Sequence, residues 1–153
     1  MFETFADLSN ISDAIDYIGS AATGGINIAD SVLTDRPFVI TQFAINQFGY
    51  SNCGLSSSKL VKLADDNPYI DALGFNCGIG PGHMEQFILK ERRHTDKYLS
   101  ALPNAGYPQA VSGRMIFSDK NMDYYSDKMC ELLNAGADII GGCCGTTPDY
   151  IDL

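Results

Sequence analysis

Basic residues are scarce in this sequence, which contains 10 lysines and arginines against 19 aspartates and glutamates and has a formal net charge of -9. An acidic surface repels phosphates and anionic lipid headgroups, so we expect neither nucleic acid nor a membrane surface as a partner. The sequence also lacks a run of about eighteen apolar residues and a basic N-terminus followed by an apolar segment. We therefore expect neither a membrane span nor a signal peptide.

The cysteines do not follow the pattern of a disulfide framework. There are 5 of them, an odd number, and two are adjacent in the sequence. This usage favours a reduced protein of the cytoplasm over a secreted one. With 153 residues and 45% hydrophobic content, the chain is long enough for one domain with its own core.

The least ordinary stretch is the decapeptide IIGGCCGTTP that ends at Pro148. Residues 137–142 have the length and β-branched content of a buried strand, and Thr147 before Pro148 is typical of a helix start. Cys143 and Cys144 therefore follow the carboxyl end of a predicted strand. Proteins that alternate strands and helices place their chemistry at this end of the sheet.

A second stretch, GFNCGIGPGHM, repeats the order of strand, cysteine and helix. The strand predicted at 69–76 places Cys77 at the same end of the sheet as the adjacent cysteines. Three thiolates select zinc or a related thiophilic ion, and three protein ligands leave a fourth position open, which is the catalytic pattern. His83 follows Cys77 at the start of a predicted helix, and we interpret it as a helix-terminus residue outside the metal site.

Four sequence blocks occur in the order GxNC, GPGHM, PNAG and GGCCGTTP. Taken in this order, the blocks resemble the homocysteine S-methyltransferase domain of methionine synthases and betaine-homocysteine methyltransferases. The resemblance spans nearly all of the chain but covers only about the second half of that domain. It implies an α/β fold, the C-terminal half of a TIM (β/α)8 barrel, with residues 1–153 forming a partial homocysteine-binding domain from about strand 4 or 5 to strand 8. A complete barrel needs about 250 residues.

The resemblance also implies the activity and the site. It implies zinc-dependent methyl transfer to the homocysteine thiolate, giving methionine, with zinc on Cys77, Cys143 and Cys144. The methyl donor is of the methylcobalamin, methyltetrahydrofolate, S-methylmethionine or betaine type, and the residues do not choose among these. Glu3 matches the family carboxylate for the substrate ammonium, although a solvated terminal glutamate explains it equally well. Asn104 matches a substrate-site amide, whereas spacing alone also fits a turn asparagine.

Hydrophobic periodicity predicts the remaining elements. A strand remnant ends near Phe5, and a buried polar residue, Gln42 or Thr41, lies within the next strand. Residues 107–118 are expected to form an extended excursion over the barrel mouth. Cys53 is interpreted as incidental, and Cys130 as a small buried or half-buried thiol. Strands are expected at 38–44, 69–76, 98–102 and 137–142. Helices are expected at 9–22, 56–64 and 121–134, with a further helix that starts at residue 81 and a short one that starts at residue 148.

An isolated half-barrel has two open edges and an uncovered inner face, which we expect to be apolar. Closure can come from an N-terminal half on another chain, from a second copy or from a rearranged edge. Two alternatives to an active enzyme remain: an inactive zinc-binding fragment, and a non-catalytic dithiol or metal-binding protein using Cys143 and Cys144. The dithiol is the least favoured, because the ring of a disulfide between adjacent cysteines is strained.

Overall fold

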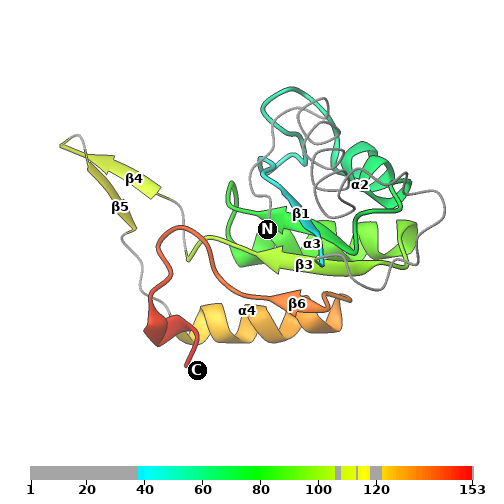
Figure 1. The fold of residues 1–153 in the computed structure, drawn as a ribbon. Helices are drawn as coiled ribbons and strands as arrows, with labels where there is room; N and C mark the ends of the chain where they lie inside the picture. Colours follow the sequence, from blue (N-terminus) through cyan, green and yellow to red (C-terminus); the bar gives the residue numbers. More distant parts are fainter. Residues whose placement is uncertain (1–37, 106–107, 113, 118–121, 153) are drawn as a thin grey trace, which may run out of the picture.

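The computed structural model describes residues 38–105, 108–112, 114–117 and 122–152 of the chain (Figure 1). Glu3, the strand remnant expected near Phe5 and the helix expected at 9–22 lie outside the described residues. Within the described ranges, no helix is long and apolar enough to cross a membrane. The cysteines predicted to bind metal all fall inside these ranges.

Four parallel strands form the main sheet, in the spatial order β1-β2-β3-β6 (Figure 1). Each lies inside a range that the sequence predicted. The last is the shortest because its regular pairing with β3 involves only Ser100 and Ala101. The strands span Ile40–Phe43 (β1), Ala72–Asn76 (β2), Tyr98–Leu102 (β3) and Ile139–Ile140 (β6).

Three helices alternate with these strands and agree with the predicted ranges. The first starts where the Ser56 side chain accepts the N–H of Lys59 at 3.4 Å, and the second starts at Pro81, whose ring suits the first helical position. A single 3-10 turn follows Pro148, as expected for a short final helix. The helical elements are α2 (Ser57–Asp65), α3 (Pro81–Glu91), η2 (Arg92–His94), α4 (Met122–Asn134) and η3 (Pro148–Tyr150).

The hydrophobic core lies between the helices and one face of the sheet. Alternate residues of each strand face it, because side chains alternate across a strand with a period of two. Complete burial of one such side chain stabilises the fold by about 1.5–3 kcal/mol. The strands contribute Phe43, Leu73, Phe75 and Leu99, and the helices contribute Leu60, Met84, Ile88 and Leu132.

The opposite face of the sheet is more polar than the sequence suggested. Gln42, 1% exposed, donates from Nε2 to Oγ of the buried Ser100 at 2.6 Å. These residues lie on β1 and β3, and the strand between them carries Gly74 in register with both. The hydrogen bond between Gln42 and Ser100 therefore passes over β2 at Gly74, which has no side chain. This confirms Gln42 as a buried, hydrogen-bonded polar residue, whereas the Thr41 hydroxyl has no hydrogen-bond partner in the described part of the chain.

We expect Gly74→Ala to destabilise the fold by about 3 kcal/mol, as overpacking of a close backbone contact does. A Cβ added at Gly74 would lie 1.9 Å from the backbone oxygen of Ser100. The midpoint of urea unfolding measures the effect. Gly80→Ala is the matched control because its Cβ would meet nothing nearer than 3.9 Å, and it should cost less than about 1 kcal/mol. Equal shifts in both variants would contradict the close approach of β2 and β3.

The segment expected to form an extended excursion contains an antiparallel hairpin. Strands β4 (Pro108–Val111) and β5 (Arg114–Phe117) pair with each other and form a separate two-stranded sheet. The hairpin follows the carboxyl end of β3 and projects away from the parallel sheet (Figure 1).

Candidate metal centre

The cysteines of the two glycine-rich blocks follow strands that end at the same edge of the sheet. Cys77 comes directly after β2, and Cys143 and Cys144 come shortly after β6. Between these strands in the sheet lies β3, whose end leads to Asn104. Because parallel strands present their carboxyl ends at one edge, residues distant in sequence meet there.

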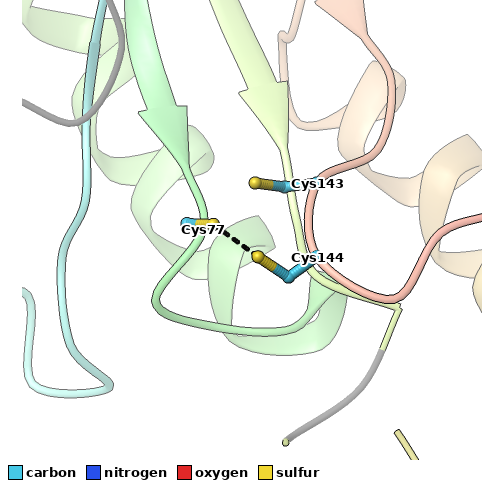
Figure 2. Close-up of side chains that lie close together, drawn as sticks. All are labelled: Cys77, Cys143 and Cys144. Carbon is cyan, nitrogen blue, oxygen red and sulfur yellow. Dashed lines mark hydrogen bonds between the residues drawn. The ribbon is translucent and has the colours of Figure 1, made fainter. Parts of the chain in front are cut away.

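The three sulfur atoms form one cluster. All of them lie within 4.8 Å of one another, and the sulfurs of Cys77 and Cys144 are 3.3 Å apart. Figure 2 shows Cys143 and Cys144 on the loop after β6, facing Cys77 at the end of β2. Cys77 and Cys143 are partly buried and Cys144 is exposed.

Cys77 adopts a backbone conformation that is uncommon for a residue with a side chain. Its φ is 55°, and the following Gly78 has a φ of 72°. A non-glycine residue in this region costs about 1–3 kcal/mol, and such residues gather at functional sites. Gly78 has a further constraint, because a Cβ there would lie 2.1 Å from the backbone oxygen of Ile45. The turn that places the Cys77 sulfur therefore depends on glycine at position 78.

The end of β3 anchors the loop that carries the other two cysteines. The N–H of Cys143 donates to the Pro103 carbonyl at 2.9 Å, and the N–H of Ala105 donates to the Cys144 carbonyl at 3.0 Å. Asn104, 5% exposed, accepts the N–H of Cys144 on its side-chain oxygen at 3.2 Å. Asn104 is thus at the site, where it orients the backbone of Cys144.

The protonation of the three thiols is linked. Burial by itself would raise the pKa of Cys77, but hydrogen bonds from Cys143 and Cys144 outweigh it, and the pKa lies below its usual value. Burial, the hydrogen bond to Cys77 and the charge of Cys77 raise the pKa of Cys143 to about 12. The hydrogen bond to Cys77 and then burial raise the pKa of Cys144. Ionisation of Cys77 is therefore favoured over ionisation of its two neighbours, and a cation among the sulfurs would favour the ionised form of all three.

The cluster fits a zinc ion. Tetrahedral zinc with Zn–S bonds of about 2.3 Å holds its sulfurs about 3.8 Å apart. The sulfurs here all lie within 4.8 Å of one another, and those of Cys77 and Cys144 are 3.3 Å apart, so these distances bracket the spacing around zinc. Three thiolates are also the donor set that thiophilic ions prefer.

The remaining candidate residues lie elsewhere or outside the described ranges. Among the described residues, this is the one group of three or more potential ligand side chains close enough to share an ion, and it excludes His83, Cys53 and Cys130. Cys130 is exposed on α4, which corrects the expectation of a buried or half-buried thiol. Glu3 cannot be placed relative to the cluster because it lies outside the described residues.

One residue beside the site lies within the helix predicted at 121–134. The side chain of Tyr125 on α4 is 1% exposed, and its hydroxyl lies 3.2 Å from the Gly141 carbonyl oxygen. Burial, followed by the charges of Cys143 and Tyr150, raises the pKa of Tyr125 to about 12, so the hydroxyl remains a proton donor at neutral pH. Helical spacing predicts burial but carries no signal for this contact.

A sequence model of one protein family matches the whole chain. It describes the homocysteine S-methyltransferases and covers residues 1–153. The match agrees with the resemblance of the glycine and cysteine blocks.

Curated relatives match a shorter part of the chain. The methionine synthases of Mycobacterium leprae (strain TN) and Mycobacterium tuberculosis (strain ATCC 25618 / H37Rv) are each 34% identical to it over 89 residues. Each match covers 54% of this chain and 7% of the relative. The chain therefore corresponds to a small part of these proteins.

Solved structures share the fold. The oxidized form of the homocysteine methyltransferase MmuM from Escherichia coli has a TM-score of 0.67 and 22% identity, over 98% of this chain and 42% of that one. Its metallated form has a TM-score of 0.63 and 23% identity, over 97% of this chain and 41% of that one. These neighbours are TIM barrels, and the chain spans less than half of their length, which confirms the partial-barrel fold predicted from the sequence.

Proposed function

Because this chain belongs to the homocysteine S-methyltransferase family, we propose that Cys77, Cys143 and Cys144 form the zinc site at which homocysteine is methylated. The observation that carries the proposal is the convergence of three sulfur atoms, from two loops that are 67 residues apart, within 4.8 Å. A structural zinc site has four protein ligands, whereas three leave a position for a substrate sulfur.

The residues of such a site have different roles. When bound, zinc would supply Lewis acidity that lowers the pKa of the homocysteine thiol and makes the sulfur a nucleophile at neutral pH. The three cysteines hold the ion, and Asn104 holds the backbone of Cys144 in place. In the reaction, the homocysteine sulfur forms a bond to the methyl carbon as the donor releases it, giving methionine. Glu3 is our candidate for binding the substrate ammonium.

We propose that the chain is part of a domain and that catalysis needs an N-terminal half of that domain. Its relatives extend well beyond it, since it covers 7% of each methionine synthase and 42% of the MmuM chain. An N-terminal half-barrel or a second copy of the chain would close the sheet beyond β1 and β6, the two outer strands of the described sheet. The methyl donor stays open among cobalamin, folate, S-methylmethionine and betaine types.

One alternative is a fragment that binds zinc but does not transfer methyl groups, because the chain spans only 42% of the MmuM chain that it matches. Homocysteine binding separates the two. We expect the zinc-loaded chain to release about one proton per site on adding homocysteine at pH 7, because a free thiol with a pKa of about 8.5 becomes a thiolate on the metal. Calorimetry in buffers of different ionisation enthalpy measures this release.

Methionine is the matched control ligand, since its sulfur has no proton to lose. Proton release with homocysteine and none with methionine supports a substrate site. Zinc binding without any response to homocysteine would favour the inactive fragment. An identical response from the metal-free chain would contradict a role for the metal.

A further inference from the structure

The segment 141–150 carries two of the three clustered cysteines, and its hydrogen bonds to the sheet all go to β3 or to the residues directly after it. Before it, β6 pairs regularly with β3 at only two residues. Within it, the N–H of Gly141 donates to Ala101 at 3.3 Å and the N–H of Cys143 donates to Pro103 at 2.9 Å. The short β6 leaves one side of the segment without strand pairing, so contacts from α4 add to the anchoring by β3.

Tyr125 on α4 contacts both ends of this segment. At the first end, its hydroxyl donates to the Gly141 carbonyl at 3.2 Å. At the other end, its ring packs edge to face against the ring of Tyr150, with centroids 5.1 Å apart and an interplanar angle of 80°. Both tyrosines are buried, at 1% and 5% exposure, so water does not compete for these contacts.

The same hydroxyl also lies near the residues that directly follow β3, which include Asn104. It lies 3.5 Å from the Pro103 carbonyl oxygen, which itself accepts the N–H of Cys143. The hydroxyl therefore lies between the carbonyls of Gly141 and Pro103, which directly follow β6 and β3. One side chain thus links these two strand ends to the helix.

We propose that Tyr125 is a positioning residue of the metal centre, which holds segment 141–150 so that the sulfurs of Cys143 and Cys144 meet that of Cys77. This inference rests on the proposed zinc site. Its physical basis is that ligands preorganised by neighbouring contacts lose little entropy when the ion binds. Partners of this kind change metal affinity by about 10–100-fold when they are removed.

Two substitutions separate the hydroxyl from the ring. Tyr125→Phe keeps the ring and its contact with Tyr150 but removes the hydrogen bond, and we expect it to weaken zinc binding about tenfold. Tyr125→Leu removes both contacts and should weaken it by up to about 100-fold. Tyr124→Phe is the control, because it removes one hydroxyl from the neighbouring residue of the same helix, whose side chain is 46% exposed.

The measurements are the zinc dissociation constant by competition with a chromophoric chelator, the absorption spectrum of the cobalt-substituted chain, and the urea midpoint of each metal-free variant. Weaker zinc binding and an altered cobalt spectrum in Tyr125→Phe, at an unchanged midpoint, support positioning. A zinc affinity within about twofold of the unsubstituted chain, or a loss of affinity that only parallels a lower midpoint, would overturn it. If the unsubstituted chain itself binds no zinc, the proposed function fails instead.

Discussion

Replacing any one of Cys77, Cys143 and Cys144 with serine is expected to abolish stoichiometric zinc binding, which should otherwise approach about one ion per site. The three sulfurs lie within 4.8 Å of one another, so each variant removes a third of the thiolate ligands. A serine hydroxyl remains protonated at neutral pH and is a poor ligand for a thiophilic ion. Metal analysis of the purified and dialysed chain gives the result directly.

Cys53→Ser and Cys130→Ser are the matched controls for this experiment. Both residues are exposed thiols that lie outside the cluster. Each control should retain the zinc content of the unsubstituted chain. A Cys130 variant that loses zinc as completely as the Cys77 variant would show that the ligand assignment is wrong.

Methyl transfer is expected to be absent or very weak until an N-terminal half-barrel is added. The chain spans less than half of the barrel proteins it resembles, and the two outer strands of its described sheet, β1 and β6, each have a neighbour on one side only. Substrate contacts that are missing or misplaced by about 1 Å cost about 100-fold in rate, so completion of the pocket should raise methionine formation by at least that factor. Mixing the chain with the first four strand-helix units of a full-length relative, and measuring methionine, tests this.

Sedimentation of the chain alone tests the same prediction by measuring whether the chain associates with itself. The outer strands β1 and β6 each have one edge without a strand partner among the described residues, and such edges pair readily with another chain. We therefore expect dimers, larger assemblies or poor solubility in the absence of a partner. A well-folded monomer that converts homocysteine to methionine unaided would contradict the need for an N-terminal half.

The order of the strands and the edge at which they end could be predicted from the sequence, and with them the meeting of the three cysteines. Cys77 and Cys143 each follow an apolar run and precede glycines and a helix start, so the alternation of strand and helix places both at one edge of a parallel sheet. Only the assumption of parallel pairing was needed, and the structure confirms that pairing. The metal itself remains a proposal.

Contacts between distant elements could not be predicted. The Gln42–Ser100 hydrogen bond crosses β2, and nothing local to either residue indicates that Gly74 lies between them. Hydrophobic periodicity predicts the helix that contains Tyr125 but could not indicate that the loop carrying Cys143 lies against the hydroxyl of this residue. Each contact depends on which elements become neighbours in space, which is a property of the tertiary fold.

X-ray absorption at the zinc edge tests the central claim most directly. For the zinc-loaded chain we predict three sulfur ligands at about 2.3 Å and one lighter ligand atom. Saturating homocysteine should change this set to four sulfurs, whereas methionine should leave it unchanged. A metal site with fewer than three sulfurs in the unsubstituted chain, or a spectrum that does not respond to homocysteine, would contradict the account of Cys77, Cys143 and Cys144 as a three-thiolate site for the substrate sulfur.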